Sequence, residues 1–240
     1  MANIQLSVDL GSKFITICQK GVGLVLREPC IAIAQKTKDR LEIREAGFRA
    51  ESIISNALGG AKVVSPVHEG FIVDEEMFTL LLKHFLKKIL PESIIPPRVK
   101  AIVNITCAMT NSDRRAVEKC FIGAGIKEVI LVESPLALLA FTGSIGGMFV
   151  DMGAGKTEIA SVTNRGIACG VAVNIAGDAF NNAIIDSIQK HVKELSKKDY
   201  SSYIQAPKQK MDYVIMFVPH TGALWTALNA QPDLWRKAME

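Results

Sequence analysis

The chain has 240 residues, of which 49% are hydrophobic and 22% are charged. These values are typical of a globular protein with one large or two small domains, and they exclude a disordered or low-complexity chain. A formal net charge of +4 is too small to indicate nucleic acid or a membrane surface as a partner. Five cysteines without a C-x-x-C pair and four scattered histidines favour reduced core thiols over a zinc site or a disulfide framework.

The N-terminus lacks the basic and apolar regions of a signal peptide. The longest uncharged stretch, residues 134–150, is short for a membrane span and is interrupted by Pro135 and several glycines. We therefore expect a cytoplasmic protein.

Residues 1–91 predict several strands followed by helices. Apolar runs predict strands over residues 4–9, 14–20, 22–26, 30–34 and 41–45, and a short helix over Arg49–Leu58. A longer helix is predicted over Asp74–Ile89, because acidic residues occupy its first turn, lysines its last turns, and apolar residues recur at helical spacing.

Residues 100–142 alternate between strand and helix patterns. Strands are predicted over Lys100–Thr106 and Glu128–Glu133, the second reading as buried. Helices are predicted over Ser112–Gly123, capped by Asn111 or Ser112, and over Leu136–Thr142, opened by a cap at Ser134 with Pro135 in the first turn. This alternation predicts an α/β fold.

Three further strands and one helix are predicted downstream. The strands cover Gly147–Asp151, Thr157–Val162 and residues 167–174. A last helix begins at Gly177-Asp178. One apolar stripe follows it: Phe180, Ile184, Ile188, Val192 and Leu195.

The stretch VDMGAGKTEIA, residues 150–160, ends its loop in the Gly-Lys-Thr of a P-loop. A P-loop needs a glycine where this chain has Val150, and a helix beginning at the Lys-Thr pair. Here the residues after Lys156 alternate polar and apolar, which predicts a strand. The stretch is therefore interpreted as a strand–GAGK–strand hairpin and not as a P-loop.

The same layout occurs twice in the chain. Residues 3–26 and 146–169 each have a strand ending in Val-Asp, a glycine turn with a lysine, a returning strand and a third strand. Two such hairpins about 140 residues apart suggest two homologous half-units. Glycine turns present backbone N–H groups to anions, and an aspartate at each strand end can hold hydrated Mg²⁺, so the pair predicts a clamp for a di- or triphosphate.

Residues 1 to about 188 resemble the MreB group of bacterial actins. VDLGS and VDMGAGKTE look like its two phosphate motifs, and LREPCIAI, SPVHEGFIVD, RRAVEKCFIGAGIKEVILVESPLALL and NIAGDAFNNAII match further landmarks in order. The resemblance implies an actin-like ATPase fold of ribonuclease H-like units. It also implies ATP (or GTP) binding with Mg²⁺, self-association into filaments, and work with the cell-shape and wall-synthesis machinery at the inner membrane face. Nucleic acid is not an expected partner.

The resemblance also implies site residues. The nucleotide would be bound by Asp9, Gly11, Ser12, Lys13, Asp151, Gly153, Gly155, Lys156, Thr157, Gly177 and Asp178, with Asp9 and Asp151 holding Mg²⁺ through water. The family has Glu-Glu-Pro where this chain has Glu133-Ser134-Pro135, and the glutamate beside the proline positions the attacking water. With Ser134 at that place and Glu133 on the other face, we expect weak or absent hydrolysis. Ala154 and Lys156 also depart from the second family loop, where positive φ would favour glycine.

The resemblance divides the chain into three parts: domain I over residues 1–145 with an insertion over about 30–74, the start of domain II over 146–188, and a fragment over 189–240. That fragment, with its HVKELSKKDY and DYVIMFVP runs, resembles part of the RmuC family of DNA recombination-associated proteins. The second actin-like domain would thus be truncated. Two alternatives to a cell-shape filament protein stay open: an RmuC-like DNA-associated fusion, and a non-catalytic remnant that binds actin-like partners.

Overall fold

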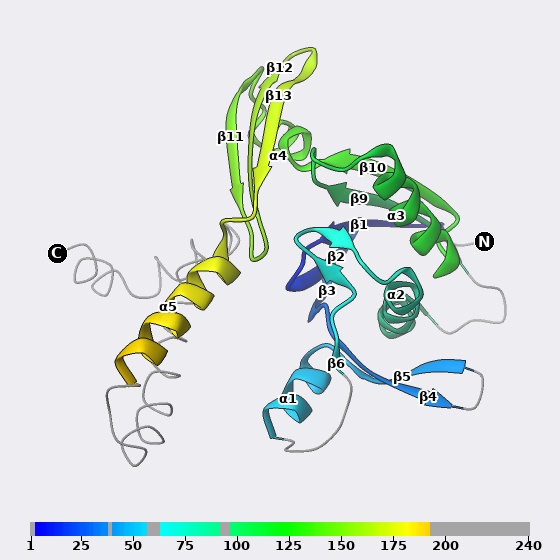
Figure 1. Ribbon diagram of the computed structural model, residues 1–240. Helices are drawn as coiled ribbons and strands as arrows, with labels where there is room; N and C mark the ends of the chain where they lie inside the picture. The colour runs from blue at the N-terminus through cyan, green and yellow to red at the C-terminus, as the bar shows by residue number, and fades with distance from the viewer. Residues whose placement is uncertain (1–2, 38–39, 57–62, 92–96, 193–240) are drawn as a thin grey trace. The chain divides into compact units, whose positions relative to one another are not determined.

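The structure is a computed structural model that describes residues 3–37, 40–56, 63–91 and 97–192 (Figure 1). The backbone packs as two compact units. One comprises Met1–Val150 with Glu158–Ala172, and the other comprises Asp151–Thr157 with Val173–Glu240.

A five-stranded mixed sheet is the centre of the first unit. Its strands are β1 (Asn3–Leu10), β2 (Phe14–Gln19), β3 (Gly23–Pro29), β9 (Arg98–Ile105) and β10 (Glu128–Glu133). They lie in the order β10-β9-β1-β2-β3. The first three strands in this order, β10, β9 and β1, run parallel, and β2 is antiparallel to both of its neighbours. The carboxyl ends of β1, β9 and β10 therefore meet at one edge of the sheet.

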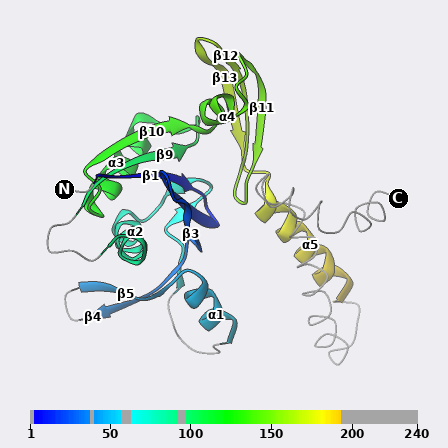
Figure 2. The same cartoon turned by 180° about the vertical axis from the view of Figure 1, so that it is seen from behind.

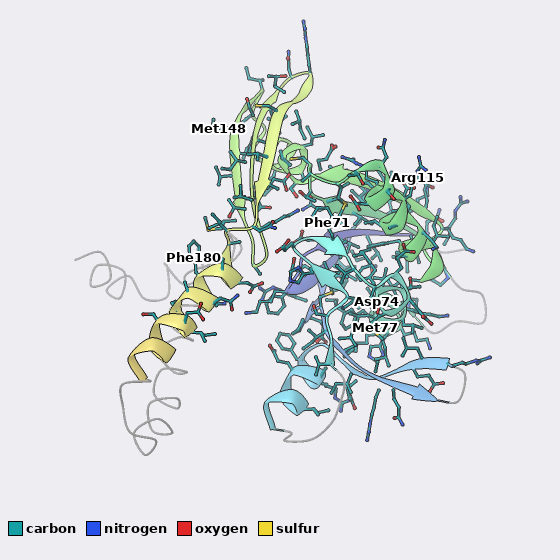
Figure 3. The ribbon with its side chains drawn as sticks, viewed as in Figure 1. Phe71, Asp74, Met77, Arg115, Met148 and Phe180 are labelled. Atoms are coloured by element: carbon teal, nitrogen blue, oxygen red, sulfur yellow. The ribbon has the colours of Figure 1, made fainter. Side chains whose placement is uncertain are left out.

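Two helices share a core with this sheet. They are α2 (Glu75–Ile89) and α3 (Asn111–Gly123), which lie close to the sheet in Figure 1. Alternate residues of β1 are buried because a strand sends successive side chains to opposite faces, and they join the apolar stripes of both helices in one cluster. Phe78 of α2 meets Phe121 of α3 with ring centroids 5.9 Å apart. Asp74 caps α2 by accepting a hydrogen bond from the Met77 amide (Figure 3).

The segment between β3 and α2 forms smaller elements. They are β4 (Ala32–Thr37), β5 (Arg40–Ala46), α1 (Phe48–Asn56), β6 (Val63–Val64), β7 (Val67–His68) and β8 (Phe71–Ile72). β4 lies between β5 and β6 in one small sheet, and β7 pairs with β8 in another.

The chain then continues through α4 (Ser134–Thr142) into a second hairpin sheet. Its strands are β11 (Gly147–Met152), β12 (Thr157–Thr163) and β13 (Gly166–Val173), in that order, and Figure 2 shows them from behind. β12 begins at Thr157, so the stretch after the GAGK loop is a strand as predicted. The last described element is α5 (Gly177–Val192).

Three local predictions need correction. The cap of α3 is Thr110, whose hydroxyl and backbone form a reciprocal capping box with Asp113, and not Asn111 or Ser112. Ser134 is the first residue of α4 and makes no capping bond; Glu133 stands at the cap position, where its side chain makes no capping hydrogen bond. β10 is the edge strand of its sheet and is only half-buried, because no described strand covers its outer side.

The helix from Gly177 continues past Ile188 to Val192, beyond the boundary at residue 188 that the resemblance predicts. Leu195, the last member of the predicted stripe, lies outside the described residues, as does the predicted fragment from residue 193 onward. Within the described residues no helix is long and apolar enough to cross a membrane.

Candidate functional site

The first glycine loop joins β1 to β2 and is closed by its own backbone. The Gly11 amide donates to the Phe14 carbonyl oxygen at 3.1 Å. An added Cβ at Gly11 would lie 2.6 Å from that same oxygen, while its φ is not in the left-handed region. Glycine is thus needed here for space, because backbone atoms cannot move aside as a flexible side chain could.

The tip of this loop is held by backbone amides of other segments of the chain. The Ser12 hydroxyl accepts a hydrogen bond from the Gly70 amide at 2.7 Å, and the Lys13 carbonyl accepts one from the Cys30 amide at 2.9 Å. The Ser12 O–H proton can still be donated to a ligand, since a hydroxyl is both donor and acceptor. The segment between β3 and α2, which contains both Cys30 and Gly70, therefore holds the tip of the loop.

Asp9 has a polar neighbour that the sequence did not single out. It lies opposite Asn104 in the parallel ladder of β1 and β9, and Asn104 Nδ2 donates to Asp9 Oδ1 at 3.1 Å. The other amide atom, Asn104 Oδ1, is buried and has no hydrogen-bond partner among the described residues. A buried carbonyl oxygen without a partner costs free energy, so this atom favours a donor or cation from outside the chain.

The pair suits a hydrated Mg²⁺ by its chemistry. Carboxylate and amide oxygens are the ligands that Mg²⁺ takes in proteins, and it is usually held by one or two carboxylates, substrate phosphates and waters. No group of three or more His, Cys, Asp or Glu side chains that could hold a metal occurs in the described part of the chain. Asp9 with Asn104 fits an ion that arrives with a nucleotide and fits poorly with a metal caged by protein alone.

At the end of β10, the side chains of Glu133 and Ser134 each make an interaction with another part of the chain. Glu133 Oε1 pairs with Arg114 Nη2 at 2.7 Å, in a half-buried ion pair. The Ser134 hydroxyl donates to the Ile105 carbonyl at 3.1 Å and is only 7% exposed. A general base needs a lone pair aimed at water, and here the carboxylate faces a guanidinium while the hydroxyl proton is already donated.

The second glycine loop, between β11 and β12, repeats the closure of the first. The Gly153 amide donates to the Lys156 carbonyl at 2.9 Å. The first-turn amides of α5 turn back onto this loop: Gly177 donates to the Gly153 carbonyl at 3.2 Å and Asp178 to the Ala154 carbonyl at 2.8 Å. Since both amides are already bonded, Gly177 and Asp178 position the loop against the helix start and do not offer those N–H groups to a ligand.

The backbone of this loop accepts Ala154 without strain. None of Gly153, Ala154 and Gly155 has a positive φ, so the cost that the sequence suggested for alanine is absent. Within the described residues, the Ala154 and Gly155 amides donate no hydrogen bond. The Thr157 hydroxyl, by contrast, already donates a hydrogen bond, to the Ile175 carbonyl at 2.6 Å. The Ala154 and Gly155 amides are therefore the donors that the loop can offer to an anion.

The predicted residues therefore fall into two groups. Asp9, Gly11, Ser12, Lys13, Glu133 and Ser134 belong to the first unit, where the ends of β1 and β10 share one sheet edge. Asp151, Gly153, Gly155, Lys156, Thr157, Gly177 and Asp178 belong to the second unit, around the start of α5. That the two groups close on one nucleotide stays a prediction.

Two side chains near these groups were missed from the sequence. One sequence signal could have pointed to Asn104: it is a polar residue near the end of a strand that the sequence predicts. Glu158 is 3% exposed, and its Oε1 accepts the Cys107 amide at 2.8 Å, which ties β12 to the turn after β9. No local sequence pattern predicts that hydrogen bond, because its two partners are 51 residues apart in the chain.

Comparison with known proteins identifies two family models. The model of the MreB/Mbl protein family matches residues 3–205, and the model of the RmuC family matches residues 173–240. Both families had been expected from the sequence, and both resemblances are confirmed. The two matches overlap over residues 173–205, which include α5.

Curated relatives match over most of this chain. The cell shape-determining protein MreB of Escherichia coli strain K12 is 30% identical over 202 residues, which is 81% of this chain and 58% of that protein. MreB of Haemophilus influenzae is 32% identical over 77% of this chain and 55% of its own length. Mbl of Bacillus subtilis is 27% identical over 79% of this chain and 58% of its own length. The chain thus spans less than two thirds of the relatives it matches.

Solved structures share the fold. MreB5 of Spiroplasma citri bound to ADP has a TM-score of 0.65 and 23% identity, over 80% of this chain and 57% of that one. A second structure of that protein, bound to AMPPNP, also has a TM-score of 0.65. The MamK double helical filament has a TM-score of 0.63 and 17% identity, over 80% of this chain and 59% of that one. The expected actin-like α/β fold is confirmed by these likenesses.

Proposed function

Because the chain belongs to the MreB/Mbl protein family, we propose that it binds a nucleotide, associates with itself into filaments and takes part in determining cell shape. The observation that carries the proposal is the buried Asn104 Oδ1, which has no partner in the part of the chain that the structure describes and lies beside Asp9 at the first glycine loop. The Spiroplasma relative, solved with ADP and with AMPPNP, supports a nucleotide as the ligand.

The ligand of the proposal is ATP or GTP with Mg²⁺. Asp9 and Asp151 would hold the ion through water, while the Ser12 hydroxyl and the Ala154 and Gly155 amides would bind phosphate oxygens. Lys13 and Lys156 would add positive charge. When bound, the ion would neutralise phosphate charge.

A binding experiment tests this directly. In equilibrium titration of the full chain with a fluorescent ATP analogue and Mg²⁺, we expect Asp9→Ala and Asn104→Ala to weaken binding at least about tenfold, which is about 1.4 kcal/mol. Gln5→Ala is the matched control, because Gln5 lies on the same side of β1 as Asp9 but away from the carboxyl end of that strand. Equal affinity in the Asp9→Ala variant and the parent would refute the site.

We propose only weak hydrolysis, because of the arrangement at the end of β10. Glu133 is paired with Arg114, and Ser134 donates to Ile105. Restoring a carboxylate with Ser134→Glu should raise nucleotide turnover, whereas Ser134→Gln, which has the same shape without the charge, should not. A parent turnover that is already high and disappears in Glu133→Gln would show that Glu133 is the base after all.

Filament formation is tested by sedimentation of the full chain with and without ATP and Mg²⁺. We expect more protein in the pellet when both are present, because self-association in this proposal follows nucleotide binding. A chain that stays in the supernatant under both conditions would support the alternative of a non-filamentous binding remnant.

The same proposal includes three further points. They are a division into domains near residues 145 and 188, contact with the wall-synthesis machinery, and a cytoplasmic location at the membrane periphery.

The RmuC match over residues 173–240 supports a second candidate, a DNA-associated role. It lies mostly outside the described residues. Retention of the full chain on immobilised DNA at low salt, lost as salt rises, would favour this role, because phosphate contacts release counterions. No retention at low salt would discard it.

A further inference from the structure

The turn that follows β9 lies directly after the residue that carries the candidate metal site. β9 ends one residue after Asn104, and residues 106–109 then lead the chain toward α3. The Met109 amide closes this turn by donating to the Thr106 carbonyl oxygen at 3.2 Å. Because the turn is so close to Asn104 in the chain, its position also determines where the Asn104 side chain lies.

A buried carboxylate from β12 binds the backbone of this turn. Glu158 is 3% exposed, and its Oε1 accepts the Cys107 amide at 2.8 Å. Both residues belong to the first compact unit. A hydrogen bond to a charged group is stronger than one between neutral groups, and removing one partner of a buried bond costs more than the bond itself contributes. Glu158 therefore fixes the Cys107 amide in place.

A second contact of the same turn depends on a glycine of β13. A Cβ added at Gly170 would lie 2.8 Å from Cys107 Sγ and 3.6 Å from the Ala160 side chain. The φ of Gly170 is not positive, so the glycine is needed for space and not for its backbone conformation. The Cys107 thiol thus occupies the place where any other residue on β13 would have its Cβ, and β12 and β13 together hold Cys107 by its amide and by its sulfur.

Two further hydrogen bonds hold the chain around this turn from the side of the helices. The Ser134 hydroxyl donates to the Ile105 carbonyl at 3.1 Å, and Arg114 Nε donates to the Met109 carbonyl at 3.4 Å. These donors belong to α4 and α3, whereas the contacts at Cys107 come from β12 and β13. The turn therefore connects the hairpin strands with the end of β9.

We infer that Glu158 is a positioning residue for the site formed by Asp9 and Asn104. The inference rests on the proposed function, in which this site serves a nucleotide with hydrated Mg²⁺. Asn104 Oδ1 is buried and has no partner among the described residues, so it can meet a ligand only where the backbone places it. Displacements of about 1 Å are costly in such sites. By fixing the turn that begins two residues after Asn104, Glu158 keeps this oxygen beside Asp9 and strengthens binding of the Mg²⁺-bound nucleotide.

Hydrogen exchange of the ligand-free full chain, followed by mass spectrometry, tests the positioning step. Peptides covering residues 104–109 should exchange at least about tenfold faster in Glu158→Ala than in the parent, because the Cys107 amide loses this acceptor. Glu158→Gln should remain close to the parent, since its amide oxygen can accept in the same place. Ser161→Ala is the matched control, because Ser161 is a half-buried polar residue on the opposite face of β12. Peptides covering residues 3–10 report whether the larger sheet stays folded.

Titration of the same variants with a fluorescent ATP analogue, once with Mg²⁺ and once with EDTA, tests the link to the site. Glu158→Ala should reduce the gain in affinity that Mg²⁺ gives by at least about tenfold, the size of effect that residues supporting metal ligands have. Its affinity in EDTA should change by less than about twofold. A residue that only stabilises the fold would change both affinities alike. Glu158→Gln should recover most of the Mg²⁺-dependent gain.

Gly170 provides an independent perturbation of the same turn. Gly170→Ala should speed exchange of residues 104–109 and reduce the Mg²⁺-dependent gain as Glu158→Ala does, because the new methyl group displaces Cys107. Adding Cys107→Ala to Gly170→Ala should restore both, because the sulfur atom that the methyl group meets is removed.

Two results would overturn the inference alone. One is equal exchange of residues 104–109 in the parent and Glu158→Ala, and the other is an equal Mg²⁺-dependent gain in a parent that binds the nucleotide and in Glu158→Ala. A parent that does not bind the nucleotide at all would refute the proposed function and this inference together.

Discussion

At Gly11 and Gly153 the same loop closure leaves different amounts of space. An added Cβ would lie 2.6 Å from the Phe14 carbonyl at Gly11, but 3.5 Å from the Lys156 carbonyl at Gly153. Neither glycine has a positive φ, so backbone strain does not separate them. The two loops are therefore similar in hydrogen bonding and unequal in tolerance.

This difference predicts the effect of two matched substitutions. Gly11→Ala should lower the free energy of unfolding by about 1–3 kcal/mol, because the new methyl group overlaps backbone atoms. Gly153→Ala should change it by no more than about 0.5 kcal/mol. Urea unfolding followed by circular dichroism measures both, and equal destabilisation would contradict the steric argument.

The cysteines differ in reactivity. Cys30 and Cys120 are buried, and burial raises the pKa of the Cys30 thiol to about 12 and raises the pKa of Cys120 in the same direction. Cys169 is exposed. Iodoacetamide reacts with thiolates, so in the native chain at pH 8 we expect labelling of Cys169, with Cys30 and Cys120 labelled only after denaturation. Mass spectrometry of the peptides locates the label, and native modification of Cys30 would contradict its burial.

At the scale of elements, the start of α3 is set by a reciprocal cap. The Thr110 backbone amide donates to Asp113 Oδ2 at 2.8 Å, and the Asp113 amide donates to the Thr110 hydroxyl at 3.3 Å. The Thr-x-x-Asp spacing was visible in the sequence as a capping-box pattern. The predicted caps, Asn111 and Ser112, lie one or two residues late, because both are also good capping types.

Replacing that cap should destabilise the protein measurably. We expect Thr110→Ala to lower the free energy of unfolding by about 1 kcal/mol, since the first-turn amide loses its acceptor. Asn111→Ala is the control, because Asn111 is an exposed residue in the first turn of the helix. A larger loss in Asn111→Ala than in Thr110→Ala would contradict the assignment of the cap.

Most elements were predictable because their signals are local. The acidic first turn and apolar stripe of α2, and the alternation of β1, depend on residues within one segment. β10 was predicted in its correct place but with the wrong exposure. Its apolar composition resembles that of a buried strand, and only the order of strands in the sheet makes it an edge.

At the scale of the whole molecule, the buried apolar residues that the structure describes are concentrated in the first unit. The large cluster comprises β1, β9, α2 and α3, and the described side chains of α5 are mostly exposed or half-buried. Local opening is cheaper where fewer apolar contacts are lost. The two units should therefore differ in local stability.

Hydrogen exchange should show this difference directly. Amides of β9 should exchange at least about a hundredfold more slowly than amides of α5, a difference of about 2.7 kcal/mol in opening free energy. The Asn104→Ala variant of the binding experiment gives a further check, since a correctly folded variant keeps slow exchange in β1. Equal protection of β9 and α5 would mean that both open together.

The sequence by itself determined the order of strands and helices, the repeated glycine hairpin and the family, because each depends on residues close together in the chain or on their order. The tertiary structure decided which polar atoms have partners. Asn104 Oδ1 is left without one among the described residues, Glu133 faces Arg114, and Glu158 accepts the Cys107 amide. Such contacts join residues from separate segments, and whether a buried polar atom is satisfied depends on the folded neighbourhood and not on local spacing.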